Sequence, residues 1–517
     1  MESLTETPWD VTISGTGLAQ SLLALGLSRS GKKVLHVDKN PYYGGSEAAF
    51  SLREAEEWAA TVNKQPGSVP FEDATVYSPE DSSEADARLS SPRAYTLALS
   101  PHLIYSRSQL LPTLVSSKVY RQLEFQAVGS WWIHKPSGNA DDNASSLYRV
   151  PGSREDVFAD DVITLKSKRT LMKFLRHIGK PQQDEEATPE ESEDLSMPFS
   201  DYLTSKFQVP AELHNPLLSL SLSQNSPQQT PAEYAVLRVK RHLASIGVFG
   251  PGFGSLIPKW GGGSEIAQVG CRALAVGGGV YVLDSSIQSI TDLPGADSDE
   301  DARMQAQLSI GESIRTKFLV GSKWDLPAEV LGAQPSYEKV ARSITVVSSP
   351  LGSLFPVTAE GGPIPAGAVV VFPGTSLGEA DDSPVYLLVH SSDTGECPTG
   401  QSVIYGSVNV SGPQGQSLLE TAVQKLLQST VGLDAKVLWS LRYTQLGRRD
   451  DASNIAEAIR TSSAPDKVIC FPPPSLDLAF DDALIDMVKE AWTMIMGAEA
   501  AQHEFMTFED RENHDEE

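Results

Sequence analysis

A glycine loop near the N-terminus has the residue spacing of a phosphate-binding turn. Gly15 and Gly17 fill the first two glycine positions of a G-x-G-x-x-G pattern, where the first makes the turn and the second admits a pyrophosphate. Gln20 stands at the third position, where a glycine or alanine normally lets helix and strand pack closely. Because a glutamine there forces the helix outward or projects into the site, the loop retains the scaffold of a dinucleotide site better than its binding surface.

Two other segments also depart from a flavin site. Residues 38–46 resemble the second signature of the glutathione-reductase-like flavoproteins, with Asp38 before a glycine pair, but Ser46 replaces the arginine that usually follows. Near the C-terminus, where such proteins have a small-residue loop beside the flavin, residues 472–474 are prolines without backbone N–H donors. We therefore expect no cofactor and interpret the loop as a strand-to-helix turn. An FAD-dependent oxidoreductase is the alternative hypothesis.

No other grouping of reactive residues indicates catalysis. The chain has nine histidines and three cysteines, and Cys271, Cys397 and Cys470 lie far apart without the spacing of a zinc site or a disulfide framework. No Ser/His/Asp arrangement or metal-ligand cluster is visible in the sequence. The residues favour a binding function over a catalytic one.

The glycine loop requires a strand before it and a helix after it. Residues 9–14 and 33–38 are short apolar runs typical of buried strands, and residues 18–29 have the apolar spacing of a helix that ends before Gly31. Two strands joined through a helix predict a parallel pair and an α/β opening.

The pattern changes to helical between residues 152 and 249, where Leu171, Phe174, Leu175 and Ile178 form one apolar stripe. Strand patterns then return, and residues 482–497 predict a final helix packed on the core. The expected strands are 280–283, 304–309, 316–320, 344–347, 368–372, 385–390 and 403–410. We predict an α/β, FAD/NAD(P)-binding-like domain with mixed sheets from residues 1–151 and 250–517, and an inserted, mainly helical domain from 152–249.

Composition and charge narrow the class of protein. Forty per cent hydrophobic and 21% charged residues are typical of a soluble globular protein, and a net charge of −26 would repel nucleic acid. The acidic stretches 72–88, 184–194 and 509–517 are interpreted as solvated loops and a tail, or as a guide for a basic partner segment. Without a signal-like start or a long apolar run, the protein is expected in the cytosol.

Residues 15–18, 28–38 and 40–45 together resemble the Rab GDP-dissociation inhibitor and Rab escort protein superfamily. Residues 150–158, 168–175 and 437–441 resemble the escort branch, also called component A of Rab geranylgeranyltransferase. The divergence of the chain around its motifs indicates a fungal-type member of that branch. The resemblance implies a non-catalytic protein that binds GDP-bound Rab GTPases, presents them to the α/β transferase heterodimer and carries the prenylated product to membranes in vesicular traffic. A recycling GDP-dissociation inhibitor is the alternative.

The resemblance also implies a Rab-binding platform at Tyr43, Glu265 and Arg272. Glu265 and Arg272 are two helical turns apart, so both charges can reach one face, although a solvated ion pair would show the same spacing. Two residues depart from the family pattern, because Val280 replaces a hydroxyl residue and Gly277 replaces an aromatic one.

Other expected sites have core packing as their alternative. A groove for the C-terminus of the GTPase is implied at Val119, Tyr120, Leu123 and Phe125. A pocket for the prenyl chain is implied in the helical lobe, with Phe174, Leu217, Leu218 and Leu222 as lining candidates. Phe199 resembles an exposed aromatic that docks the transferase, an assignment that requires it to be accessible.

Overall fold

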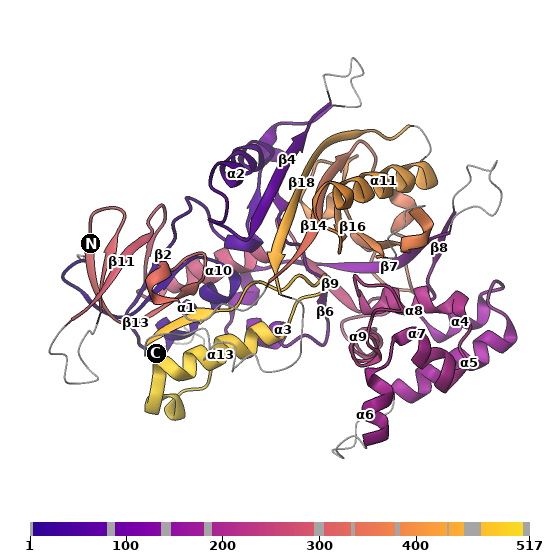
Figure 1. Cartoon of the computed structure of the whole chain (residues 1–517), viewed down its shortest axis with the longest axis horizontal. Coiled ribbons are helices and arrows are strands. Elements are labelled where there is room, and N and C mark those ends of the chain that lie inside the picture. The colour runs from indigo at the N-terminus through magenta and orange to yellow at the C-terminus, as the bar shows by residue number, and fades with distance from the viewer. Residues whose placement is uncertain are drawn as a thin grey trace, which may run out of the picture.

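A computed structural model describes residues 4–79, 88–135, 146–179, 189–293, 304–331, 337–377, 383–431, 434–448 and 467–509. Of the acidic stretches expected to be solvated loops and a tail, residues 80–87, 184–188 and 510–517 lie outside the described residues, whereas residues 72–77 belong to a strand and residues 189–194 to a helix. The described chain forms mixed α/β layers with a helical region at one end, which confirms the predicted fold class (Figure 1).

The first sheet contains the strands that flank the glycine loop. Its order is β10-β2-β1-β13-β12-β11, with β19 also paired to β13. The bounds are β1 Pro8–Ser14, β2 Val34–Val37, β10 Val280–Val282, β11 Ile287–Asp292, β12 Met304–Leu308, β13 Ser313–Ser322 and β19 Val468–Phe471. β1 pairs with β2 and β13 in parallel, while β12 is antiparallel to β11 and β13. The predicted parallel opening is confirmed.

Three helices from distant parts of the chain cover this sheet together. α1 (Leu18–Arg29) packs against both α10 (Gly263–Val276) and α13 (Ala483–Met496). Leu22, Leu23 and Leu25 are buried with apolar residues of α10 and α13 in one core cluster. Because α1 begins directly after the glycine loop, the packing of α1 against α10 and α13 fixes the direction in which the loop points.

The second sheet is largely antiparallel and forms the body of the molecule. Its order is β4-β18-β14-β17-β16-β15-β7-β9-β6, with β8 paired to β7. The bounds are β4 Phe71–Tyr77, β6 Ile104–Tyr105, β7 Phe125–Lys135, β8 Ser146–Arg149, β9 Ser255–Pro258, β14 Glu338–Val347, β15 Gly367–Phe372, β16 Val385–Ser391, β17 Ser402–Val408 and β18 Val437–Gly447. α11 (Gly412–Thr430) packs on β14, β16 and β17 and covers one face.

Short elements connect the two sheets. β3 (Ala49–Phe50) pairs with β5 (Leu97–Ala98), and α2 (Leu52–Lys64) starts at a capping box between Ser51 and Glu54. α3 (Leu110–Ser116) and the 3-10 helix η4 (Val119–Gln122) precede β7. The contact between η4 and α10 joins this connection to the first sheet.

The helical region consists of consecutive helices at one end of the molecule (Figure 1). The bounds are α4 Arg154–Ala159, α5 Leu165–Ile178, α6 Pro189–Ser196, α7 Phe199–Tyr202, α8 His214–Ser221 and α9 Ala232–Ser245. Leu171, Phe174 and Ile178 on α5 are buried, as the apolar stripe predicts. The division into domains at residues 151 and 250 stays a prediction.

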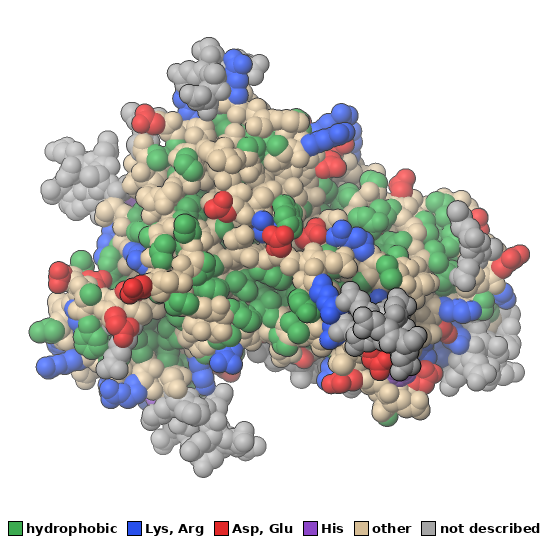
Figure 2. Space-filling view, turned by 180° about the vertical axis from the view of Figure 1, so that it is seen from behind, with side chains coloured by type: hydrophobic (Ala, Val, Ile, Leu, Met, Phe, Trp, Pro, Cys, Tyr) green, Lys and Arg blue, Asp and Glu red, His purple; other side chains and the backbone are tan. Residues whose placement is uncertain are grey.

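The molecular surface has a pronounced apolar region. Figure 2 shows hydrophobic side chains gathered over the middle of the face opposite to that in Figure 1. The exposed large apolar side chains include Val115, Tyr120, Trp260 and Val276. Contiguous apolar surface of this kind is typical of a binding face rather than of a surface that only meets solvent.

Candidate functional site

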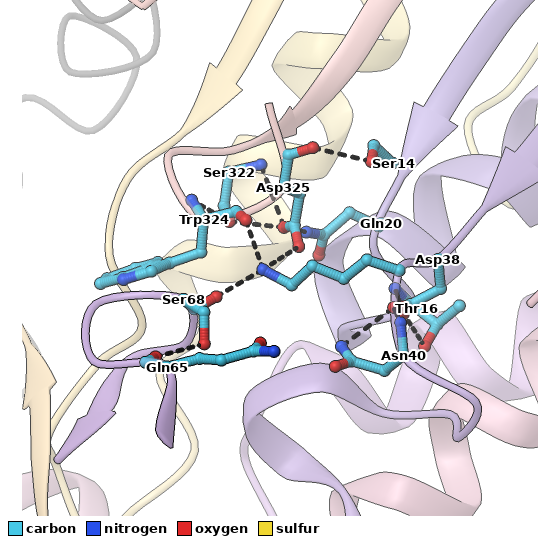
Figure 3. Close-up of polar contacts among 11 residues, drawn as sticks. Ser14, Thr16, Gln20, Asp38, Asn40, Gln65, Ser68, Ser322, Trp324 and Asp325 are labelled. Carbon is cyan, nitrogen blue, oxygen red and sulfur yellow. Dashed lines mark hydrogen bonds and ion pairs between the residues drawn. The ribbon is translucent and has the colours of Figure 1, made fainter. Parts of the chain in front are cut away.

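The glycine loop is stabilised by the protein's own acidic side chains. Asp38, at the end of β2, accepts hydrogen bonds from the backbone N–H and the hydroxyl of Thr16, each at 2.7 Å. It also accepts from the backbone N–H of Asn40 at 2.8 Å (Figure 3). Burial, together with the charge of Asp325, raises the pKa of Asp38 to about 6. The acidic residue that would face a ribose in a dinucleotide site is therefore used to fix the loop.

The N-terminus of α1, where a pyrophosphate would lie, is also occupied by side chains. The backbone N–H of Leu18 donates to Oε2 of Glu47 at 3.2 Å. Ser46, which replaces the expected arginine, donates to the same carboxylate at 2.7 Å. Gln20 donates to Asp325 at 3.3 Å. A phosphate here would meet the carboxylates of Glu47 and Asp325 in place of N–H donors, so these residues do not fit a dinucleotide.

A cavity of about 120 Å³ remains beside the loop. Its lining includes Lys39, Arg448 and the prolines at 472–474. Lys39 donates to the backbone carbonyls of Ser68 and Trp324, and its ammonium lies 4.0 Å from Asp325 (Figure 3). Arg448 forms an ion pair with Asp481. Both cations of this lining are therefore engaged by protein groups.

The two tyrosines after β2 have different environments. The ring of Tyr42 packs edge-on against Phe50, with centroids 4.8 Å apart, and contributes to the core beside the second sheet. Tyr43 is partly exposed, and its ring lies 5.6 Å from that of Tyr281 on β10. Both rings are partly buried, but Tyr42 packs against the core and Tyr43 does not, so Tyr43 stays the predicted contact for a partner.

The two charged residues of α10 form an ion pair, with Nη2 of Arg272 2.8 Å from Oε1 of Glu265. The side chain of Arg272 is 56% exposed and that of Glu265 is 18% exposed, so the pair borders solvent. Placement two turns apart on one helix brings them together, as the spacing predicts.

The start of α10 packs directly against the tyrosine–glycine loop. Gly44 has a φ of +99°, and a β-carbon there would lie 3.2 Å from Oγ of Ser264. A β-carbon at Gly263 would lie 3.2 Å from Cβ of Glu47. Tyr43, Glu265 and Arg272, which we call the platform, therefore project from two adjoining, closely packed elements.

One corner of the platform is apolar. Gly277 follows the end of α10, and its N–H donates to the carbonyl of Ala273. Val280 opens β10, which lies at the end of its sheet, and Val276 beside it is 69% exposed. The hydroxyl residue expected near this corner is thus replaced by an apolar surface.

The expected groove is only partly accessible. Val119 and Leu123 are buried in the core around α1 and α10, so these two side chains do not line a groove. Tyr120 is 41% exposed, and Phe125 is partly buried where β7 pairs with β9. Tyr120 and Phe125 therefore remain the candidates for contact with an extended segment.

The helical region contains an apolar cavity of about 270 Å³. Of the four predicted lining residues, Leu217 lines it, whereas Phe174, Leu218 and Leu222 are buried without lining it, which corrects those three assignments. Sequence reasoning missed other lining residues, although the stripe on α5 already contained two of them. They include Val157, Ile163, Leu171, Leu175, Leu213 and Leu220.

A family model described as GDI, GDP dissociation inhibitor, matches residues 5–432 of the chain. The chain belongs to the GDP dissociation inhibitor family. Within this family the chain is similar to Rab proteins geranylgeranyltransferase component A of Candida albicans, with 30% identity over 423 residues. That match covers 81% of this chain and 62% of the relative, so the chain spans less than two thirds of that relative's length.

Two further matches cover a larger share of the relative's own length. Rab proteins geranylgeranyltransferase component A of Drosophila melanogaster is 27% identical over 492 residues, which are 92% of this chain and 86% of the relative. The crystal structure of RAB GDI from Plasmodium falciparum has a TM-score of 0.65 at 18% identity and covers 95% of this chain and 98% of that one. The structural likeness supports the fold of the GDP dissociation inhibitor family.

Phe199 does not have the exposure that its predicted role requires. Its side chain is 0% exposed and packs near Phe174, with ring centroids 6.2 Å apart. Its backbone N–H donates to the carbonyl of Thr230 at 2.8 Å, which anchors α7 to the segment before α9. The assignment of Phe199 as an exposed transferase-docking residue is wrong, because this aromatic is part of the helical core.

Metal-ligand groups and membrane-spanning helices are both absent from the described residues of this GDP dissociation inhibitor family member. Among them, no group of three or more histidine, cysteine or acidic residues is arranged to hold a metal ion. In the same part of the chain, no helix combines the length and apolar character that crossing a bilayer requires.

Proposed function

We propose that this protein is a Rab escort protein. It binds unprenylated, GDP-bound Rab GTPases, presents them to the α/β heterodimer of Rab geranylgeranyltransferase and delivers the prenylated product to membranes. The observation that carries the proposal is the platform, in which Tyr43 and the Glu265–Arg272 pair project from adjoining elements of a GDP dissociation inhibitor fold. The relatives named component A support the escort branch of the family.

The side chains of the platform are suited to bind the surface of a GTPase, which differs between the GDP-bound and GTP-bound forms. Tyr43 provides a rigid ring and a hydroxyl, and such side chains often anchor interfaces. Arg272 can exchange its contact with Glu265 for a carboxylate or carbonyl on the GTPase. Two charges of opposite sign select a partner with the complementary pair, and discriminate against surfaces that lack it.

The cavity of the helical region suits the lipid. A geranylgeranyl chain leaves water favourably when it enters an apolar site, with about 0.8 kcal/mol gained per buried methylene. Leu217 and its apolar neighbours provide such a lining. In this proposal the protein works in the cytosol and meets membranes only while it releases its cargo.

The proposed protein does not catalyse the transfer itself. The isoprenoid–cysteine bond forms on the transferase heterodimer, and this chain holds the protein substrate. The glycine loop contributes rigidity rather than cofactor chemistry, because Asp38 and Glu47 already accept hydrogen bonds from the N–H groups of Thr16 and Leu18. No step of the proposed function passes through a flavin.

A reconstituted transfer assay tests the proposal. Purified protein, the transferase heterodimer, labelled geranylgeranyl diphosphate and a GDP-loaded Rab should give labelled Rab only when the protein is present. A preparation that extracts prenylated Rab from membranes but does not stimulate transfer would instead identify a recycling inhibitor. Flavin absorbance of the purified protein would favour the oxidoreductase alternative.

A further inference from the structure

The chain enters α10 through an unusual turn. Trp260, Gly261 and Gly262 have φ values of +57°, +112° and +62°, so three consecutive residues lie in the positive-φ region. Glycine adopts this region freely, whereas a β-carbon is crowded there and a bulky aromatic is an outlier. The turn itself would therefore favour a glycine or asparagine at position 260, and it does not account for an indole.

The indole is held on one side and open on the other. The backbone N–H of Trp260 donates to the carbonyl of Thr394 at 3.0 Å. The ring lies so close to Gly395 that a β-carbon there would be 2.5 Å from Cδ1 of Trp260. Nζ of Lys259 lies 4.6 Å from the ring centroid. The side chain nevertheless remains 40% exposed, so these contacts fix its position and leave a surface for a further contact.

Trp260 joins the platform to the groove candidates. On one side, Pro258 pairs with Phe125, and Lys259 forms an ion pair with Glu124 at 3.1 Å. On the other side, the turn leads directly into the first turn of α10, which carries Glu265. Because η4, the element of Tyr120, also packs against α10, the groove candidates and the platform form one continuous structural unit around this turn.

We propose that Trp260, in the turn that leads from β9 into α10, is a further contact residue for the GTPase. The inference rests on the proposed function and adds a residue that the family resemblance does not supply. An immobilised, half-open indole loses little conformational freedom on binding, and it presents a flat apolar surface to an apolar side chain of the GTPase. The adjoining ammonium of Lys259, which is also paired with Glu124, stabilises the ring through a cation–π contact.

Glycine and tyrosine variants separate a binding role from a structural one. Trp260→Gly removes the indole and relieves the left-handed strain, so the melting temperature should stay the same or rise. The Kd for a GDP-loaded, unprenylated Rab GTPase should increase at least about tenfold. Trp260→Tyr keeps a flat ring and should stay within about threefold of the wild-type Kd. The Kd values of both variants can be measured by titration of a fluorescently labelled GTPase.

Gln208→Gly is the matched control. Gln208 is also exposed with a left-handed φ of +58°, but it lies after α7 in the helical region. Its replacement should leave the Kd unchanged. Wild-type affinity in Trp260→Gly, or a loss of affinity together with a lowered melting temperature in that variant, would overturn the inference. If the wild-type protein does not bind the GTPase, the proposed function fails and the inference fails with it, whereas normal binding by Trp260→Gly overturns the inference alone.

Discussion

Arg272 and Glu265 form an ion pair across two turns of α10, with Nη2 and Oε1 2.8 Å apart. The overall charge of the chain is −26, but the two charges of this pair neutralise each other in the free protein. A partner must therefore share or replace this contact rather than meet two free charges. Because the arginine is the more exposed member, we expect it to make the first contact with the GTPase.

The first prediction concerns this arginine. Arg272→Ala should weaken binding of a GDP-loaded Rab about tenfold, because a partly desolvated charged contact is lost. Its exposure limits the effect on the free energy of unfolding to less than about 1 kcal/mol. Arg53→Ala, which breaks an exposed ion pair with Glu57 on α2, is the control and should leave the Kd unchanged. Equal affinities of the two variants would contradict a role for Arg272.

The second prediction concerns the tyrosine of the platform. Tyr43→Phe retains the ring that packs near Tyr281, so the fold should be unaffected and only a hydroxyl contact is lost. Tyr43→Ala should weaken binding of the GTPase by about tenfold or more, as truncation of an aromatic anchor does. Isothermal titration of both variants distinguishes the contribution of the ring from that of the hydroxyl. A normal Kd for Tyr43→Ala would remove this residue from the platform.

The third prediction tests the cavity of the helical region. Leu217→Trp should fill part of the cavity of about 270 Å³ and reduce the affinity for prenylated Rab, while binding of unprenylated Rab stays the same. Overpacking should destabilise the fold by about 1–3 kcal/mol, so the melting temperature is measured in parallel. Leu237→Trp on α9 is the control, because Leu237 is 53% exposed. A similar loss of affinity for both forms of Rab would indicate general damage instead.

The fourth prediction concerns acid stability. Burial lowers the pKa of His242 from 6.5 to about 4, so the folded protein favours the neutral ring. Above pH 6.5 the neutral ring makes its full contribution to the free energy of unfolding. This contribution decreases by up to about 3 kcal/mol as the pH falls from 6.5 towards 4, because the unfolded chain then binds the proton more readily. His242→Phe keeps a ring beside Tyr105 and Trp131 and should reduce this loss in urea titrations at pH 7, 5.5 and 4. His503 is exposed, so the control variant His503→Phe should lose stability with falling pH as the wild type does.

Local sequence patterns predicted the elements around the glycine loop well. Helix 18–29 was predicted with the bounds that α1 has, because its apolar residues and the following Gly31 act over a short range. β18 (Val437–Gly447) was not predicted, although it pairs with β4 and β14 in the second sheet. Its sequence includes Arg442, Thr444 and Gln445, and a strand of this composition depends on partners that are distant in the chain.

The site was predictable where spacing alone brings residues together. The pair of Glu265 and Arg272 follows from one helix, and the difference between Tyr42 and Tyr43 follows from adjacent positions in one turn. Phe199 was misassigned because an aromatic residue beside a proline has the same local sequence whether it is exposed or covered by α5 and α9. Burial in a helical core depends on tertiary packing, which a single sequence does not reveal.

The stacking of α1 between α10 and α13 has a consequence for the time course of synthesis. During translation α10 leaves the ribosome long before α13, yet α13 completes the apolar environment of the helix against which α10 packs. A nascent chain released before residue 496 would contain Tyr43, Glu265 and Arg272 without the packing that holds their elements together. The packing that holds these elements is therefore complete only after residues 483–496 have been synthesised.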